Sequence, residues 1–377
     1  MSASLLSAQR DDLAGLAQRG RLRMLSPRAG VDFASNDYLG LANSAVLADA
    51  MRSALDRGVP VGSGGSRLLR GNHPEHEALE TEAAAFFGSE AALFLATGFA
   101  ANSALLATLP QRGDLILADE LIHASSHEGL RLTRAEHRLV AHNDVTAFAD
   151  AIAAWRRAGG TGHVWLAVET LYSMDGDFAP LAQLSELALH EGAILLADEA
   201  HATGVYGPGG RGLVADLPAR DHVISLHTCG KALGVEGALL CGPGAMRESL
   251  VNRARGLIFS TAPSPLIAAV VRAALRIVAD GDAMRDELAA RIAAARDLLA
   301  PLGALCHGSP IVPLVLGGDV RTMAVAARLQ TAGFDVRGIR PPTVPEGSSR
   351  LRIVITRNAG LDDIAALAAA LGAALTP

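Results

Sequence analysis

Between about residues 85 and 245, short and nearly continuous apolar runs alternate with longer Ala-rich or amphipathic stretches. The apolar runs are 91–96, 115–118, 164–169, 193–198, 223–227 and 237–241. Strands that are covered on both faces have this pattern, and the stretches between the runs are long enough for crossover helices. The pattern predicts an α/β protein with a doubly wound, mostly parallel sheet, whose ligands bind at the carboxyl ends of the strands.

The last third of the chain has a different pattern. Two long Ala/Leu/Arg stretches, 265–280 and 282–302, predict helices. Three further apolar runs follow, at 310–316, 334–339 and 350–356. This part is therefore predicted to form a small α+β domain.

The length of 377 residues is more than one ordinary core uses, since domains cluster near ~100–150 residues and long α/β units reach ~250. We expect an N-terminal arm over 1–40, with a helix and a short strand. A large cofactor-binding α/β domain is expected over 41–280, and the small C-terminal α+β domain over 281–377.

Composition and charge exclude several classes of protein. Half of the residues are apolar, 19% are charged and the net charge is −6, so nucleic acids and anionic membranes are poor partners. The most apolar stretch, 265–279, carries Arg272 and Arg276 and is too short for a membrane span. The first twelve residues lack the apolar core of a signal peptide, and three scattered cysteines form neither a disulfide framework nor a zinc set. We expect a soluble cytoplasmic protein without a metal site.

One residue stands out by its rarity. Of the 33 Lys and Arg residues in the chain, Lys231 is the only lysine, and all the others are arginine. A guanidinium stays charged, whereas an ammonium can lose its proton and form a Schiff base. A single lysine can also survive by chance, so its neighbours decide its interpretation.

Lys231 lies near other polar residues at predicted strand ends. Asp198 ends the run 193–198, His201 follows it, and the run 223–227 leads into Thr228 and Lys231. Pyridoxal phosphate requires such a set: an amine for covalent attachment, a carboxylate that keeps the pyridine nitrogen protonated, and hydroxyls and amides for the phosphate. The alternative for Asp198 and His201 is a helix-capping Asp beside a surface His.

Three Gly-containing turns are candidate phosphate sites. The run 91–96 breaks at Thr97-Gly98-Phe99 before an Ala/Leu helix pattern, and a helix start of this kind binds phosphate. The segment 62–66 is Gly-rich but lacks the Lys of a nucleotide-binding P-loop. The segment 207–212 contains Pro208 and follows no predicted strand, so we interpret it as a loop.

Two more polar groups follow predicted strands. His123 comes shortly after the run 115–118, where its imidazole could stack on a planar ring, although a structural role is the commoner one for a histidine. Glu169 and Ser173 flank the end of the run 164–169. The Asp175-Gly176 pair beside them is also typical of a plain turn.

Taken together, these segments resemble the α-oxoamine synthase family of pyridoxal-phosphate enzymes, which have the type I aminotransferase fold. The resemblance runs from about Asn36 to Thr356. Its motifs are Ser35-Asn36-Asp37-Tyr38-Leu39-Gly40-Leu41, Gly62-Ser63-Gly64-Gly65-Ser66-Arg67, His123-Ala124-Ser125, His142-Asn143-Asp144, Ser173-Met174-Asp175-Gly176-Asp177, Asp198-Glu199-Ala200-His201, Thr228-Cys229-Gly230-Lys231-Ala232 and Ser260-Thr261. Within the family, the segments 340–345 and 350–352 are most similar to the enzymes of biotin biosynthesis.

The resemblance implies a role for each matching residue toward pyridoxal 5'-phosphate. Lys231 would form the Schiff base, Asp198 would pair with the pyridine nitrogen, His201 would meet the phenolic oxygen, and His123 would stack on the ring and take part in catalysis. The remaining cofactor contacts would be Gly98, Phe99, Ser173 and Thr228, with Ser260 and Thr261 reaching the phosphate across a homodimer interface.

The resemblance also implies substrate contacts. Arg352 and Asn36 would take the amino-acid carboxylate, His123 would lie beside the substrate, and Thr343 would touch the acyl group. An arginine of the N-terminal arm binds substrate in this family; we assign Arg19, and the nearby alternatives are Arg21 and Arg23.

The activity implied is a decarboxylating condensation of L-alanine with a pimeloyl thioester, carried by CoA or by acyl carrier protein. Three alternatives stay open: the same chemistry with glycine and a short acyl-CoA, an NAD-dependent dehydrogenase, and a non-catalytic regulatory domain of the same fold. The chain departs from the family at Ala202, where Gly is usual, at Arg357-Asn358, where a His is frequent, and in its shorter N-terminal arm.

Overall fold

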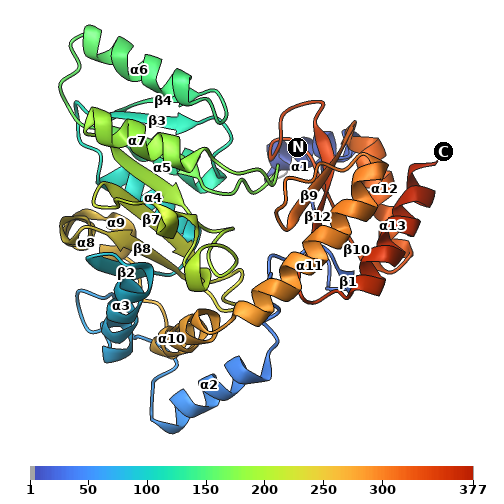
Figure 1. Cartoon of the computed structure of the whole chain (residues 1–377), viewed down its shortest axis with the longest axis horizontal. Helices are drawn as coiled ribbons and strands as arrows, with labels where there is room; N and C mark the ends of the chain where they lie inside the picture. The colour runs from blue at the N-terminus through green and yellow to red at the C-terminus, as the bar shows by residue number, and fades with distance from the viewer. Residues whose placement is uncertain (1–4, 377) are drawn as a thin grey trace. The chain divides into compact units, whose positions relative to one another are not determined.

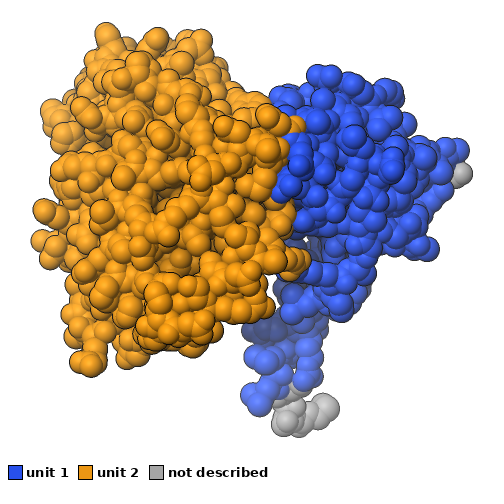
Figure 2. All heavy atoms as spheres, turned by 60° about the horizontal axis from the view of Figure 1, so that its bottom comes forward, with its two compact units in different colours: residues 1–35, 174–176, 287–377 blue, residues 36–173, 177–286 orange. Residues whose placement is uncertain are grey.

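The computed structural model describes residues 5–376, which form two compact units. Unit 2 comprises Asn36–Ser173 and Asp177–Asp286. Unit 1 comprises the described residues up to Ser35, the short segment Met174–Gly176, and those from Glu287 onward, as coloured in Figure 2. The described N-terminal and C-terminal segments therefore belong to the same unit, and the chain passes between the units at Ser35/Asn36 and Asp286/Glu287. The expected division into an arm over 1–40, a large domain over 41–280 and a small domain over 281–377 stays a prediction.

Unit 2 is built on a seven-stranded sheet (Figure 1). Its strands, in spatial order, are β2 (Ala91–Leu95), β8 (Ala238–Gly242), β7 (Val223–Thr228), β6 (Ile194–Asp198), β5 (Val164–Glu169), β3 (Leu115–Asp119) and β4 (Glu136–Val140). Only β8 runs antiparallel to its neighbours within this sheet. The predicted doubly wound, mostly parallel sheet is confirmed. Strand β4 was missed because its sequence, Glu-His-Arg-Leu-Val, is largely polar on an exposed sheet edge.

Helices cover both faces of this sheet (Figure 1). On one face lie α4 (Gly98–Thr108), α5 (Ala124–Leu132), α8 (Gly244–Arg253) and α9 (Arg255–Ile258). On the other face lie α6 (Val145–Arg157) and α7 (Leu181–Glu191). Successive residues of a strand enter opposite cores, as Ile116 and Leu117 do. Both faces are therefore buried, which explains the continuous apolar runs.

Three more helices complete unit 2. They are α2 (Ala45–Asp56), α3 (Pro74–Phe87) and α10 (Pro265–Ala279), and α10 packs against the other two. Helix α10 begins at Ser264, whose side chain accepts hydrogen bonds from the amides of Leu266 and Ile267. A polar N-cap before Pro265 thus fixes the start of the predicted helix.

Unit 1 contains a small antiparallel sheet of β11 (Arg337–Ile339), β12 (Ser349–Val354) and β9 (Ile311–Gly317). A separate parallel pair joins β1 (Val31–Asp32) to β10 (Phe334–Asp335). The helices are α1 (Ser7–Gln18), α12 (Asp319–Thr331), α13 (Leu361–Leu375) and α11 (Asp282–Leu299), whose first turn is part of unit 2. The predicted run 334–339 is divided into two strands at Val336. Between residues 5 and 376, no helix is long and apolar enough to cross a membrane.

Candidate active site

Polar side chains gather at the carboxyl edge of the sheet of unit 2. Strands β5, β6 and β7 end at Glu169, Asp198 and Thr228, and Lys231 follows in the turn after β7. Glu169 and Asp198 are direct partners in the parallel register. Because parallel strands end at the same edge, residues from distant parts of the sequence meet here.

The amine of Lys231 begins a chain of hydrogen bonds. Its Nζ lies 2.7 Å from His201 Nε2, and His201 Nδ1 lies 2.5 Å from the hydroxyl oxygen of Tyr38. The Tyr38 hydroxyl in turn donates to Asn36 Oδ1 at 3.3 Å. A lysine ammonium can only donate, so a neutral His201 accepts at Nε2 and donates from Nδ1 to Tyr38. The chain fixes the direction of the amine and links Lys231 to Asn36.

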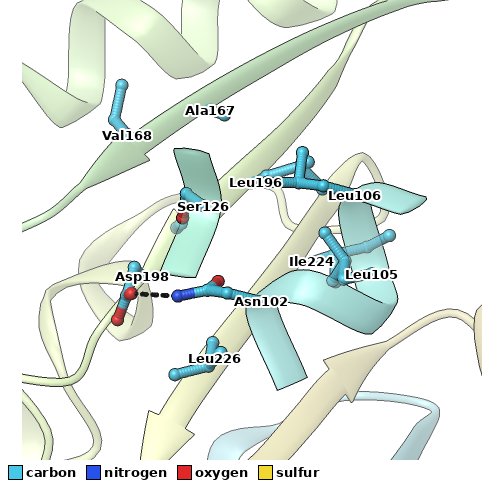
Figure 3. Close-up of a pocket in the computed structure, with 11 residues that line it drawn as sticks. Asn102, Leu105, Leu106, Ser126, Ala167, Val168, Leu196, Asp198, Ile224 and Leu226 are labelled. Atoms are coloured by element: carbon cyan, nitrogen blue, oxygen red, sulfur yellow. Dashed lines mark hydrogen bonds between the residues drawn. The ribbon is translucent and has the colours of Figure 1, made fainter. Parts of the chain in front are cut away.

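Asp198 is a buried carboxylate with two N–H donors. The side-chain amide of Asn102, on α4, donates to Asp198 Oδ2 at 2.7 Å, as drawn in Figure 3. The amide of Ala200 donates to Oδ1 at 2.9 Å. Beside them is a cavity of about 20 Å³, lined mainly by apolar residues such as Leu105 and Leu226. That space suits roughly one water molecule.

Asn102 also sets the orientation of His123. Its amide donates a second hydrogen bond to Ser125 Oγ at 3.0 Å. Ser125 Oγ lies 2.7 Å from His123 Nδ1, which also accepts from the Ser125 amide at 3.2 Å. Nδ1 is therefore an acceptor, and the neutral ring carries its proton on Nε2. Burial lowers the pKa of His123 against the opposing charge of Asp198, which favours this neutral form.

The start of α4 presents free amides. Thr97 caps the helix by accepting from the amide of Ala100 at 3.0 Å, and the helix begins at Gly98. A Cβ added at Gly98 would lie 3.5 Å from Thr228 Oγ1, so the helix start and the turn before Lys231 are neighbours. The first amides of a helix bind anions. Among the three Gly-containing turns, this is the one that the sequence predicts as a phosphate site.

The other two Gly-rich segments have structural explanations. In the segment 207–212, a Cβ on Gly212 would come within 2.0 Å of Glu199 Oε2, and the buried Glu199 carboxyl accepts from the amides of Leu213 and Val214. The segment contains a short 3₁₀ helix, Pro208–Gly210, and does not directly follow a strand, unlike a dinucleotide-binding turn. The segment 62–66 is bonded to the segment that carries Ser260 and Thr261: Ser63 Oγ donates to Pro263 O at 2.6 Å, and Ala262 N donates to Gly65 O at 2.9 Å.

His142 lies at the centre of a second polar cluster in unit 2. Its Nδ1 is 2.9 Å from Asp119 Oδ1 and its Nε2 is 2.8 Å from Asp177 Oδ2. Burial opposes the charged imidazole, but the hydrogen bonds to the two carboxylates raise the pKa of His142 to about 10. Tyr172 packs edge-on against the ring. The charged His142 thus joins Asp119, at the end of β3, to Asp177.

The predicted substrate residues of unit 1 lie on strand β12, in the connection between β11 and β12, and in the N-terminal segment. Arg352 is a buried residue of β12, and Thr343 Oγ1 accepts from Arg23 Nη2 at 3.3 Å. Arg21 is held by Asp319 and Glu346. The guanidinium of Arg19 instead lies along its own helix, 3.7 Å from where a Cβ on Gly15 would be. Of the three arginines, Arg23 is the one bonded to Thr343.

The departures from the family pattern fit their surroundings. Ala202 is fully buried in a turn, and its amide donates to Glu199 O at 3.0 Å without a left-handed backbone. The methyl group is therefore accommodated. Arg357 pairs with Glu287, and Asn358 Nδ2 donates to Asp32 Oδ2 at 3.2 Å.

The family model for aminotransferases of class I and II matches residues 28–368. The chain belongs to the aminotransferase class I and II family. Within this family, the chain is 43% identical over 350 residues to an 8-amino-7-oxononanoate synthase of Paraburkholderia phymatum, covering 90% of this chain and 88% of the relative. It is 40% identical to a synthase of the same name from Azoarcus sp., covering 94% of each chain. The resemblance to α-oxoamine synthases is confirmed.

Solved structures of the family have the same fold. A serine palmitoyltransferase of Sphingomonas wittichii superposes with a TM-score of 0.89 at 26% identity, covering 99% of this chain and 98% of that one. An 8-amino-7-oxononanoate synthase of Francisella tularensis has a TM-score of 0.76 at 26% identity, with coverages of 91% and 97%. A further neighbour, with a TM-score of 0.89 and 25% identity, is SPT with a PLP internal aldimine. The predicted type I transferase fold is confirmed.

Three contributors to the site escaped the sequence patterns. Asn102 lies inside an Ala-rich helix, and its spacing gives no sign that it faces Asp198. Tyr38 belongs to one of the family motifs, but nothing in the sequence places its hydroxyl against His201. Glu169 was noted only as a polar strand end, although it is the register partner of Asp198.

Proposed function

We propose that this chain condenses L-alanine with a pimeloyl thioester, with loss of CO₂ and the thiol, to give 8-amino-7-oxononanoate for biotin biosynthesis. The observation that carries the proposal is the position of the only lysine, whose amine is 2.7 Å from His201 Nε2 at the carboxyl edge of the sheet. Relatives at 40–44% identity carry the name of this activity. The chain is thus a pyridoxal-phosphate-dependent acyltransferase.

The residues at this edge fit pyridoxal 5'-phosphate. The first amides of α4 suit its phosphate, Asp198 suits a protonated pyridine nitrogen, and Lys231 suits the aldehyde carbon. Thr228, Ser173, Phe99 and the ring of His123 are the remaining candidates to line the cofactor. When bound, the cofactor supplies an electron sink that stabilises negative charge at the substrate Cα.

The protein side chains supply proton transfer and orientation. Lys231 would act as the general base that removes the Cα proton of alanine, and its bond to His201 would direct the amine. The carboxyl group of Asp198, held by Asn102, would pair with a protonated pyridine nitrogen. Arg352 clamps the alanine carboxylate with two parallel hydrogen bonds, assisted by Asn36. Alanine then gains its new C–C bond at Cα as the thiol leaves.

Arg23 is a better candidate than Arg19 for contact with the acyl substrate. Thr343 is assigned to the acyl group, and Arg23 is the arginine bonded to it. Arg21 has two carboxylate partners and Arg19 folds along α1. A guanidinium beside Thr343 suits the free carboxylate of a pimeloyl chain.

The proposed active form is a homodimer in which Ser260 and Thr261 reach the partner's phosphate. Support comes from exposed apolar side chains in the two bonded segments near residues 61–69 and 259–264: Val61 is 69% exposed, Leu69 85% and Phe259 72%. A second copy would remove these side chains from water. Phe259→Asp should yield a monomer in light scattering, with a weaker affinity for the cofactor.

The test of the function is a substrate panel with the purified holoenzyme. L-Alanine, glycine and L-serine are each combined with pimeloyl-CoA, pimeloyl-acyl carrier protein and acetyl-CoA, and products are identified by mass. Formation of 8-amino-7-oxononanoate from alanine and a pimeloyl thioester, with rates at least ~10-fold above the other pairs, is expected. Preference for glycine with acetyl-CoA would instead support a glycine C-acyltransferase.

A variant of Asp198 distinguishes the proposed catalytic function from a protein that only binds the cofactor. Asp198→Asn replaces the carboxylate that stabilises the protonated ring, and a neutral ring is a poor electron sink. A loss of at least ~10²-fold in kcat is expected, about 2.7 kcal/mol of barrier. Near-normal turnover would show that another carboxylate has this role.

A further inference from the structure

A second buried carboxyl group lies beside Asp198. Glu169 is the last residue of β5, is only 2% exposed, and is the register partner of Asp198 on β6. Register partners on adjacent parallel strands project to the same face of the sheet. Two acidic side chains therefore occupy neighbouring positions at the carboxyl edge, and the catalytic scheme uses only one of them.

The two carboxyl groups have different hydrogen-bond environments. Each oxygen of Asp198 accepts from an N–H group, one from Asn102 and one from Ala200. Glu169 Oε2 accepts from the amide of Ser173 at 3.0 Å, but among the described residues Glu169 Oε1 has no partner. A buried anionic oxygen without a donor is strongly unfavourable. If one proton is available to the pair, these contacts place it on Glu169.

The charges around Glu169 agree with this assignment. Burial and the negative charge of Asp198 raise the pKa of Glu169 to about 8, against the opposing charge of Lys231 and the hydrogen bonds from Ser173. Tyr172, the other titratable neighbour, has its own pKa raised by burial and stays neutral.

We propose that Glu169 is a positioning residue that remains protonated at neutral pH, leaves Asp198 as the single anion of the pair, and fixes Ser173 through Oε2. Ser173 is the last residue of unit 2 before the chain enters the Met174–Gly176 segment of unit 1. The hydrogen bond from the Ser173 amide to Glu169 Oε2 ties this turn to the end of β5. The proposal rests on the proposed function only for the identity of the cofactor; the proton on Glu169 is a property of the protein.

The decisive variant is Glu169→Gln, which mimics the protonated acid. The matched control is Glu199→Gln, at a buried carboxyl whose two oxygens both accept backbone N–H groups. Burial raises the pKa of Glu199 to about 7. Above that pH both oxygens of the ionised carboxyl accept, an amide NH₂ cannot replace an acceptor, and the control should lower the melting temperature. Glu169→Gln should retain the wild-type melting temperature near pH 6, because Oε1 has no donor to lose.

The functional readout is the affinity of the apoprotein for pyridoxal phosphate, measured by absorbance between pH 6.5 and 9. One pH unit above the pKa, only about a tenth of Glu169 stays protonated. The ionised form leaves Oε1 as a buried anion without a donor among the described residues, which favours rearrangement of the turn around Ser173. With the protonated form as the binding-competent one, the wild-type Kd should rise up to ~10-fold relative to the Gln variant. Comparing the two proteins cancels the titration of Lys231 and of the cofactor itself. Parallel Kd profiles for the two proteins would overturn the proposal.

An infrared measurement on the wild-type protein with ¹³C-labelled glutamate keeps the test independent of how the variants fold. A carbonyl band of a protonated glutamate at pH 7 that persists in Glu199→Gln and disappears above about pH 8 supports the proposal. Absence of any protonated glutamate at pH 7 refutes it. A protein that shows this band yet binds no pyridoxal phosphate would refute the proposed function and leave the proton assignment intact.

Discussion

Asn102 offers a direct test of the architecture around Asp198. Its side chain donates to Asp198 at 2.7 Å and to Ser125 at 3.0 Å, and through Ser125 it orients His123. Asn102→Ala removes both donors without touching the cofactor positions. One oxygen of a buried carboxylate then loses its only observed donor.

The expected loss follows from the two hydrogen bonds. A bond to a charged group contributes roughly 1.5–3 kcal/mol and a neutral bond about 0.5–1.5, so Asn102→Ala should lower the free energy of unfolding by about 2–4.5 kcal/mol. Alanine is also the better helix former, which offsets a few tenths of a kcal/mol. The control is Asn252→Ala on α8, where an exposed amide donates only to Glu248 O. It shares the helix-propensity gain and should be nearly neutral.

Tryptophan fluorescence of the apoprotein during urea unfolding is the appropriate assay. Both tryptophans, Trp155 and Trp165, are buried in unit 2, so the signal reports the unit that contains Asn102. The fluorescence midpoint should fall for Asn102→Ala and stay near wild type for Asn252→Ala. Equal midpoints for the two variants would show that the amide of Asn102 does not hold Asp198.

Three other predictions use different residues. Borohydride reduction of the holoenzyme should attach the cofactor covalently to Lys231 alone. Lys231→Arg should abolish both this attachment and turnover, since guanidinium cannot form a Schiff base. Peptide mapping that locates the attached cofactor at another residue would disprove the assignment. The raised pKa of His142 means that its stabilisation is fully present below about 6.5 and is lost as pH rises through about 10. His142→Gln should therefore flatten the alkaline decline in unfolding free energy, and an unchanged slope contradicts this. Arg352→Ala should raise the Kd for alanine on the order of 10–100-fold and leave the cofactor spectrum intact. Thr343→Val should instead raise only the KM of the acyl thioester. If both variants weaken the binding of both ligands equally, the role of the two residues is merely structural.

The strand ends could be predicted because burial on both faces leaves a clear sequence pattern. Asp198, Thr228 and Lys231 were therefore placed at one edge from the chain alone. Strand β4 escaped because an exposed edge strand needs no apolar run. The predicted helix 282–302 ends as α11 at Leu299, followed by a short 3₁₀ turn.

The hydrogen-bond network of the site could not be predicted in the same way. Asn102 is separated from Asp198 by many residues, and only the packing of α4 on the sheet brings the amide to the carboxylate. The choice among Arg19, Arg21 and Arg23 likewise depends on carboxylates and a hydroxyl from distant segments. Local spacing holds no information about such partners, because they are set by tertiary packing.

The pairing of β1 with β10 has a consequence for how the protein is made. Val31 pairs with Phe334, and all of the residues of unit 2 lie between them in the sequence. At the ribosome, where synthesis proceeds at about 5–20 residues per second, the first strand waits on the order of tens of seconds for its partner. Unit 2 can therefore collapse around its sheet while β1 is still unpaired. A chain that stops near Asp286 would lack β10, with which β1 pairs. Its N-terminal segment would also lack the other residues of unit 1 from Glu287 onward.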